Sequence, residues 1–199
     1  MTEGKVNKTE VRQLESENER LKKVVDRLKG LTQKYRSAEV VQKALFRISE
    51  LAASVREMDN FYRSLHGIIG ELMYARNFYI CLYDAKQEIV DFVYFVDEID
   101  QDTIFEQVPI DQLSKGLTGY VLRKGQPLRC PPEVYRRLIE QGEIEGLGAE
   151  QQDWLGVPLK HGNATIGIMV VQSYNEDVRY DSADEDLLMF VSQHVVNAL

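Results

Sequence analysis

The first part of the chain repeats apolar residues with the spacing of an amphipathic helix. From about residue 6 to residue 56 there is no proline, and charged residues are dense. The positions seven residues apart are Leu14, Leu21 and Leu28 (d), alternating with Val11, Asn18 and Val25 (a). This is the pattern of a two-stranded coiled coil. An Asn at an a position pairs best with its own twin, so the pattern predicts a parallel, in-register homodimer, with a long monomeric helix as the alternative.

This register does not continue as an apolar stripe. Thr32 and Glu39 would occupy a positions and Gln42 a d position. A shifted stripe follows, made of Val41, Leu45, Ile48, Ala52 and Val55. The change predicts that the coiled coil ends near residues 30–35 and that a second helix runs from about residue 38 to residue 57. The coiled-coil helix is therefore assigned to residues 1–36 and a globular domain to residues 37–199.

The period then changes from that of helices to that of strands. A helix capped by Asp59 or Asn60 is expected up to about residue 73. Residues 77–83 and 88–96 are β-branched and aromatic and predict one antiparallel hairpin, and residues 154–160 and 165–173 predict another. A last helix begins near Asp181 or Ser182, where Ser182 and Glu185 have the spacing of a capping box. Hairpins between helices indicate an α+β fold with helices packed on one face of an antiparallel sheet.

Composition excludes several classes of function. A chain of 199 residues with 44% hydrophobic residues can bury one core and carry an extended arm. A formal charge of −8 predicts neither a nucleic-acid nor a membrane-surface partner. The charged amino terminus is unlike a signal peptide, and only two cysteines are present, which together favour a reduced, cytoplasmic location.

The stretch KGLTGYVLRKGQPLRC, residues 115–130, contains a Gly-x-x-Gly pair beside basic residues. A phosphate loop would need a preceding strand and a Lys-Ser or Lys-Thr pair after the second glycine, and Tyr-Val stands there instead. The glycines are better explained as the ends of a short helix, with Gly125 at its left-handed carboxyl end. Gly119 lies inside the helix, which indicates close packing at that point.

Several longer stretches together resemble a GAF domain, a small-molecule-binding and dimerising module of signalling proteins. These are GLTGYVLRKGQPL, DWLGVPLKHGNATIGIMVVQSY and YDSADEDLLMFVSQHVVNAL. NFYICLYD and YFVDEID are similar to GAF domains that precede diguanylate cyclase or cyclic-di-GMP phosphodiesterase domains in bacterial proteins. The resemblance covers residues 37–199. It implies a sheet of about six strands, terminal helices on one face, and a ligand pocket on the other, partly covered by residues 116–146. We expect the homodimer contacts to be made by the coiled coil and the terminal helices.

The ligand is not specified by this resemblance. The signatures of cyclic-nucleotide-binding and bilin-binding GAF domains are absent, so neither cyclic GMP nor a bilin is expected, and the cofactor is unknown. Residues with large faces, polar groups or soft sulfur are the candidate pocket residues: Tyr79, Tyr94, Tyr120, Cys130, Trp154 and Met169. For each of them, ordinary core packing is the alternative. No effector motif precedes Leu199, and we expect an effector domain downstream of it in a longer protein.

Other reactive side chains indicate no catalytic or metal site. Asp97, Glu98, Asp100 and Asp102 are expected in a solvated loop, since the glycine and the last glutamate of a calcium loop are missing. His66, His161 and His194 are scattered. Cys81 is expected to be buried and Cys130 more accessible, and the two do not match the clustered cysteines of the GAF branch that reduces free methionine sulfoxide. A sensor, a structural dimerisation module and a thiol enzyme remain as three functional hypotheses, with the sensor preferred.

Overall fold

The long amino-terminal helix is one continuous element. The computed structural model describes residues 8–53, 57–99, 107–146 and 151–199, and α1 runs over Lys8–Ala53. The second helix predicted from about residue 38 is therefore not a separate element but part of α1, and the end of the coiled coil near residues 30–35 stays a prediction. A glycine costs a helix only about 1 kcal/mol, and no proline interrupts the backbone hydrogen bonds, so Gly30 does not end it. The chain forms two compact units, Met1–Lys43 and Ala44–Leu199.

The second helix, α2 (Met58–Gly70), begins earlier than predicted. Its N-cap is Glu57, so Asp59 and Asn60 lie in the first turn and do not cap it, although the Asn60 side-chain amide donates to Glu57 Oε2 at 2.7 Å. Buried residues recur at helical spacing along one side: Phe61, Tyr62, Leu65, Ile68 and Ile69. This apolar stripe fixes which side of α2 faces the core.

Six antiparallel strands form the predicted central sheet. They are β1 (Asn77–Asp84), β2 (Ile89–Val96), β3 (Gln107–Pro109), β4 (Leu128–Arg129), β5 (Asp153–His161) and β6 (Ala164–Ser173), in the order β3-β2-β1-β6-β5-β4. Both predicted hairpins, β1–β2 and β5–β6, are confirmed. β1 and β6 pair in the middle, so both faces of the sheet can be covered there.

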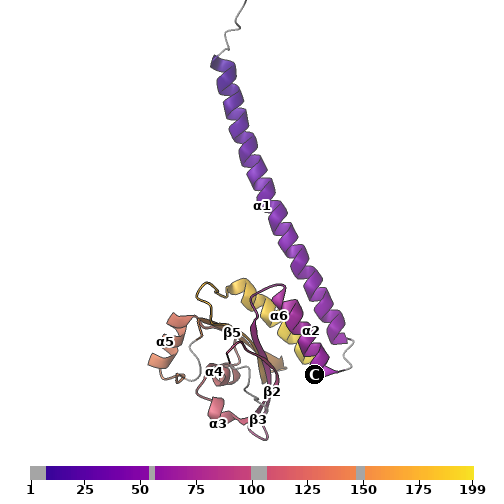
Figure 1. Cartoon of the computed structure of the whole chain (residues 1–199), viewed down its shortest axis with the longest axis vertical. Coiled ribbons are helices and arrows are strands. Elements are labelled where there is room, and N and C mark those ends of the chain that lie inside the picture. The colour runs from indigo at the N-terminus through magenta and orange to yellow at the C-terminus, as the bar shows by residue number, and fades with distance from the viewer. Residues whose placement is uncertain (1–7, 54–56, 100–106, 147–150) are drawn as a thin grey trace, which may run out of the picture. The chain divides into compact units, whose positions relative to one another are not determined.

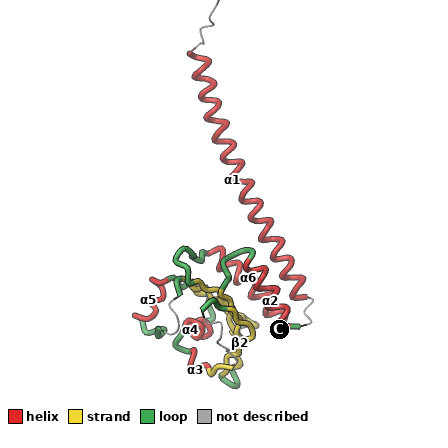
Figure 2. Tube along the Cα trace, in the orientation of Figure 1, coloured by secondary structure: helices red, strands yellow, loops and turns green. Residues whose placement is uncertain are grey.

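Helices cover both faces of this sheet (Figures 1 and 2). On one side lie α2 and α6 (Ser182–Ala198). On the other lie α3 (Ile110–Leu113), α4 (Leu117–Lys124) and α5 (Pro132–Glu140). Alternate residues of β1 supply the two cores: Phe78 and Ile80 belong to the cluster under α2 and α6, whereas Tyr79 and Cys81 belong to the cluster under α4 and α5. We call these the helix-side core and the cover-side core, and residues 116–146 the cover.

The last helix, α6, has a capping box one residue earlier than predicted. Asp181 is the N-cap, and its Oδ1 accepts from the backbone N–H groups of Ala183 at 2.7 Å and Asp184 at 3.1 Å. In return, Asp184 Oδ2 accepts from the Asp181 N–H at 2.9 Å. Ser182 and Glu185 have the same spacing, but Asp181 is the residue that keeps the extended backbone required of an N-cap.

Candidate functional site

The cover is held over the sheet by the glycines that the sequence singled out. Gly116 is the N-cap of α4, and Gly125 ends the helix with φ of 59° in the left-handed region, as predicted. A Cβ at Gly119 would lie 2.3 Å from the Leu113 carbonyl oxygen, which confirms the expected close packing. α4 thereby packs on β5 and β6, and buried Leu117 and Val121 enter the cover-side core.

A buried polar pair lies inside this apolar layer. The Tyr79 hydroxyl on β1 is 3.0 Å from Thr118 Oγ1 on α4, and both residues are at least nine-tenths buried. Burial raises the pKa of Tyr79 well above its ordinary value, although hydrogen bonding by Thr118 and Trp154 offsets part of the effect. The phenol is therefore neutral at physiological pH. It can donate and accept hydrogen bonds at the same time, as a recognition group in a small-molecule site must.

Aromatic rings extend from Tyr79 towards the sheet edge. The ring centroid of Tyr79 lies 5.6 Å from that of Phe92 and 6.0 Å from that of Phe95, and these two rings are 6.1 Å apart. Their distances fall in the range of favourable aromatic pairs. Phe92 and Phe95 are only half-buried, so part of this aromatic group remains accessible from outside.

A β-bulge in β2 places these two rings on the same face. The register passes from Ile80 opposite Tyr94 to Leu82 opposite Asp91, so that Phe92 and Val93 both stand opposite Cys81. A bulge of this kind shifts the alternation of side chains and bends the strand. Phe92 and Phe95 consequently reach the cover-side core although they are an odd number of residues apart.

The structure divides the predicted pocket residues between the two faces. Tyr79, Cys130 and Trp154 are buried in the cover-side core, and half-buried Tyr120 packs against it. Met169 is completely buried in the helix-side core, because it alternates with Ile168 and Val170, which face the cover. A ligand role for the four residues on the cover side stays a prediction.

Tyr94 also lies on the helix side, held by a histidine of α2. Its hydroxyl is 2.9 Å from His66 Nδ1, and His66 Nε2 is 2.6 Å from the Ala75 carbonyl oxygen. Since a carbonyl can only accept, Nε2 carries the proton and Nδ1 accepts from the Tyr94 hydroxyl. This arrangement assigns His66 a structural role in tying α2 to the sheet.

Sequence reasoning missed Thr118, Phe92 and Phe95. Thr118 was not among the predicted pocket residues. Its hydroxyl, between Leu117 and Gly119 in a short helix with buried residues, is the sequence signal that could have identified it. Nothing in a single strand sequence announces a bulge, so the common face of Phe92 and Phe95 could not be predicted.

The two thiols are separated and inert. Cys130 is 1% exposed, which overturns the expectation that it is accessible, and Cys81 is fully buried as expected. Burial raises the pKa of each to about 12. Because β6 and β5 lie between β1 and β4, three strand spacings of about 4.8 Å put the two cysteines about 14 Å apart or more, beyond disulfide reach. Thiolate chemistry needs the opposite environment.

The acidic loop after β2 is partly buried, contrary to expectation. Asp97 is 6% exposed and accepts from Gln172 Nε2 at 2.7 Å and from the Tyr174 hydroxyl at 3.1 Å. Fully buried Asn77 accepts from the Glu98 N–H at 2.7 Å and fixes the same segment. These contacts anchor the end of β2 to β1 and β6. Asp100 and Asp102 lie outside the described residues.

Ion pairs connect α4 to the end of the cover. Lys124 Nζ is 2.9 Å from Glu143 Oε1, and Lys115 pairs with Glu145. Arg123 donates to the Glu143 carbonyl oxygen at 3.0 Å and also to that of Ser114. All these side chains are substantially exposed, and such pairs contribute about 0–1 kcal/mol each. Lys115, Arg123 and Lys124 of the KGLTGYVLRK stretch therefore contribute to closing the cover.

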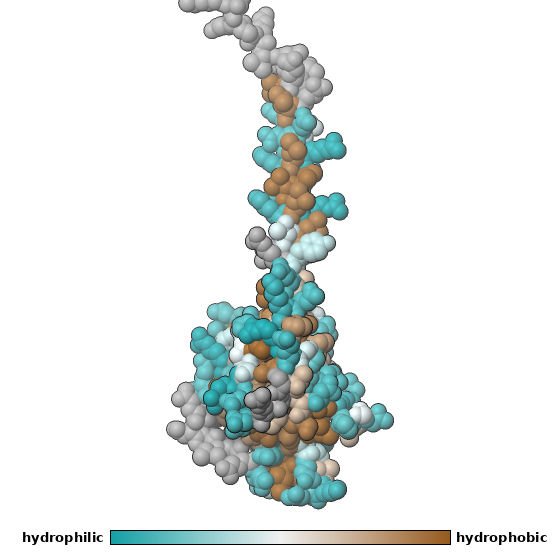
Figure 3. Space-filling view, turned by 90° about the vertical axis from the view of Figure 1, so that its right-hand side faces the viewer, coloured by the Kyte–Doolittle hydropathy of each residue, from teal (hydrophilic) through white to brown (hydrophobic). Residues whose placement is uncertain are grey.

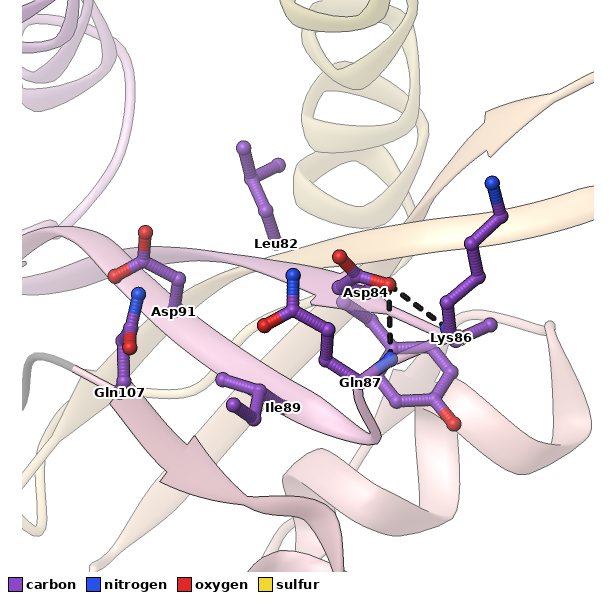
Figure 4. Close-up of a pocket in the computed structure, with 9 residues that line it drawn as sticks. Leu82, Asp84, Lys86, Gln87, Ile89, Asp91 and Gln107 are labelled. Carbon is purple, nitrogen blue, oxygen red and sulfur yellow. Dashed lines mark hydrogen bonds between the residues drawn. The ribbon is translucent and has the colours of Figure 1, made fainter.

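A separate hollow surrounds the β1–β2 turn (Figure 4). It is lined by Leu82, Tyr83, Asp84, Ala85, Lys86, Gln87, Ile89, Asp91 and Gln107. Asp84 Oδ1 accepts from the backbone N–H groups of Lys86 at 2.8 Å and Gln87 at 3.1 Å, which lowers the pKa of Asp84. This carboxylate is committed to the turn, and the hollow is open to solvent, so we assign it no ligand role.

The described residues contain neither a candidate metal cluster nor a candidate membrane-spanning helix. No three His, Cys, Asp or Glu side chains among them are grouped closely enough to hold a metal ion. None of the described helices has the length and apolar composition needed to cross a membrane.

The helices, six-stranded sheet and cover define a family. The model of the GAF domain family matches residues 55–199, and the chain belongs to that family. The resemblance to a GAF domain noted in the sequence is thus confirmed over residues 55–199. A comparison with curated protein sequences gave no match.

Solved structures with the same fold are distant in sequence. The GAF domain of an Acinetobacter phosphoenolpyruvate-protein phosphotransferase has a TM-score of 0.62 at 17% identity, covering 79% of this chain and 90% of that one. The free methionine-R-sulfoxide reductase of Neisseria meningitidis, solved with its substrate, has a TM-score of 0.61 at 13% identity, covering 79% and 87%. The A. aeolicus NlH2 GAF domain has a TM-score of 0.57 at 10% identity, covering 80% and 95%. At these identities the likeness shows the fold alone.

Proposed function

We propose that this chain is the sensory module of a cytoplasmic bacterial signalling protein, which binds a small molecule between the sheet and the cover. The observation that carries the proposal is the buried Tyr79–Thr118 pair beside the Phe92 and Phe95 rings. Small-molecule sites are mostly apolar and aromatic with a few converging polar groups, which is the composition of this layer. The Neisseria relative, solved with its substrate, is a precedent for ligand binding on the same fold.

Ligand entry requires the cover to move, because its own side chains fill the layer. Leu117, Val121, Leu138 and Ile144 are all buried there. The ion pairs of Lys115 and Lys124 that close the cover are exposed and individually weak, so the buried apolar side chains set most of the free-energy cost of opening it. A ligand that favours one of two cover arrangements would shift the population between them, which is the requirement for a sensor.

We propose further that the module forms a parallel homodimer through the a/d face of α1 and passes its signal to a downstream effector. The leucine heptads and Asn18 support this dimer. The resemblance of NFYICLYD and YFVDEID to GAF domains that precede diguanylate cyclases and phosphodiesterases favours an effector in cyclic-di-GMP signalling. Reading the natural gene beyond Leu199 tests this last point, and an effector domain of another class there would contradict it.

An enzyme activity is not part of the proposal. The buried, high-pKa thiols of Cys81 and Cys130 argue against the thiol chemistry of a sulfoxide reductase. The second candidate function is a structural dimerisation module whose cover-side core is permanently closed. The buried side chains of the cover favour this alternative.

Native mass spectrometry of the gently purified chain separates these functions. We expect the native chain to carry the extra mass of a bound small molecule, which disappears on denaturation. The Tyr79→Phe variant should carry no such extra mass. Tyr94→Phe is the matched control, because it removes a hydroxyl from the opposite face of the same sheet. A chain at bare mass, whose thermal stability also does not respond to a library of small metabolites, would support the structural module instead.

A further inference from the structure

Helix α1 presents an exposed apolar face along its described length. Among its residues, the exposed fractions are 36% for Val11, 66% for Leu14, 58% for Leu21, 45% for Val25 and 56% for Leu28. Brown, hydrophobic groups follow this helix in Figure 3. These are the a and d positions of the heptads, and an apolar face of this extent on a helix needs a partner.

The final turns of α1 have a second apolar face. Ala44 is 3% exposed and Ile48 is fully buried, and both belong to the helix-side core, with Leu51 packed against it. In the heptad register these are f, c and f positions, which lie opposite a and d. Of the shifted stripe that predicted the end of the coiled coil, Ile48 therefore lies in the helix-side core and Ala52 packs against it. Their packing there gives no reason for the first face to end.

The original register leads from the heptads to an exposed aromatic residue. If the register is continued beyond Glu39, the next a position is Phe46. Phe46 is 63% exposed, although Ile48, two residues later, is fully buried. Phe46 also follows Leu28 by 46 − 28 = 18 residues, and at about 3.6 residues per turn this is five whole turns of a helix. Both ways of counting assign Phe46 to the same side of the helix as the leucines.

At the next turn of α1, this face lies beside α6. Ser49, the following d position, has its Oγ 3.5 Å from His194 Nε2. The His194 ring lies 4.8 Å from that of Phe190, which is 42% exposed. Phe190, an exposed aromatic residue of α6, thus lies near the a/d face. A chain that docked on Phe46 would therefore also contact the surface of α6.

We propose that Phe46 is part of the homodimer interface, and that a second copy of this chain covers the a/d face of α1 from Val11 to Phe46. The inference rests on the parallel dimer proposed above. The occupant is a second copy because Phe46 shares its register with Asn18, which pairs best with its own twin, and because parallel in-register helices place each a residue beside its counterpart. Between the two apolar stretches, Glu39 forms an ion pair with Lys43 at 2.7 Å, so its charge is compensated within the helix.

This interface would link dimerisation to the helix-side core, on the opposite face of the sheet from the proposed ligand site. Phe46 and Ile48 occupy opposite sides of the same helical turn, and Ile48 packs in the helix-side core with residues of β1 and β6. A change in the packing of that core would alter the position of Phe46 against the second copy. α1 is therefore the element by which the globular unit influences the coiled coil.

Disulfide trapping in the full-length chain tests the proposal. Three single-cysteine additions are compared under mild oxidation: Leu14→Cys reports the heptads, Phe46→Cys reports the proposed extension, and Val40→Cys is the control. Val40 is an apolar b position of the same helix and is 53% exposed. Cys81 and Cys130 are buried in the unmodified chain, and its own cross-linking under the same oxidation provides the background.

The expected result is rapid covalent dimer formation by the Leu14 and Phe46 variants and little by the Val40 variant. Cross-linking at Leu14 without cross-linking at Phe46 would overturn the extension while leaving the coiled coil intact. Absence of cross-linking at both, with a monomer in sedimentation, would overturn the dimer itself. As a second measurement, Phe46→Glu should raise the dimer Kd at least about tenfold, since it removes a buried aromatic contact, whereas Val40→Glu should not. An unchanged Kd for Phe46→Glu would contradict the proposal.

Discussion

The indole ring of Trp154 lies over the backbone of Gly156 on the same face of β5. A Cβ at Gly156 would be 2.1 Å from the ring carbon Cη2, and Trp154 is only 2% exposed, so the ring has little freedom to move. The glycine therefore makes the space in which this large side chain reaches the cover-side core. Trp154 and Gly156 act as one unit of packing beneath the cover.

Replacing Gly156 by alanine should destabilise the protein. The added methyl group overlaps a buried ring, and overpacking of this kind costs about 1–3 kcal/mol. Urea unfolding monitored by Trp fluorescence measures the effect, and Trp154 is the single tryptophan. Gly67→Ala is the control, because nothing lies within 4 Å of its Cβ and alanine in a helix gains up to about 1 kcal/mol. A Gly156→Ala protein as stable as the unmodified chain would show that the ring is not confined there.

Gly119→Ala should loosen the cover. Its Cβ would lie 2.3 Å from the Leu113 carbonyl oxygen and 2.6 Å from the Ser114 Cα, and backbone atoms cannot rotate away. We expect faster amide hydrogen exchange over residues 117–124 and a loss of about 1–3 kcal/mol in the free energy of unfolding. Gly146 lies in the same cover, and a Cβ added there would be 3.7 Å from its nearest neighbour. Gly146→Ala should therefore change the hydrogen exchange and the free energy of unfolding less than Gly119→Ala does. Equal exchange in the two variants would contradict the packing described for α4.

The two buried thiols should contribute to the loss of folding stability at alkaline pH. The folded-state pKa of Cys81 and of Cys130 is raised to about 12 by burial, from an ordinary value of 9.0. The unfolded chain therefore releases these protons first as pH rises, and stability contributed by the protonated thiols is lost between about pH 9 and pH 12. Denaturant midpoints across this range should fall less steeply for a Cys81→Ala, Cys130→Ala double variant. At pH 8 neither native thiol should react with a disulfide reagent until the chain unfolds, and rapid labelling would contradict their burial.

Asn18→Val should raise thermal stability and reduce specificity. A buried polar residue at an a position costs stability but restricts the number and alignment of the helices, so an apolar replacement favours additional assemblies. Sedimentation should show a broader set of oligomers together with a higher midpoint of helix melting. Lys23→Val, at the outward f position of the same helix, should have neither effect. A monomer with or without the substitution would contradict the role assigned to Asn18.

The sequence predicted elements whose causes are local. The β1–β2 and β5–β6 hairpins follow from β-branched and aromatic runs joined by short turns, and Gly125 was placed correctly because only a left-handed residue ends α4 in this way. Less of the candidate site was predicted: Tyr79 was recognised, whereas Thr118, Phe92 and Phe95 were not. The face on which a side chain lies depends on the strand register, and the bulge at Phe92 and Val93 changes it without any local signal.

By itself, therefore, the sequence determined the two hairpins, the last helix, the antiparallel sheet and the resemblance to a GAF domain, because periodicity and turn chemistry act over a few residues. Only the tertiary structure decided that Cys130 and Asp97 are buried, and that Tyr94 and Met169 face the helices while Tyr79 meets Thr118. Each of these depends on which distant segment covers a residue. Ile48 and Phe46 show the reason plainly: both are apolar neighbours on one helix, and only packing against the globular unit separates a buried side chain from an exposed one.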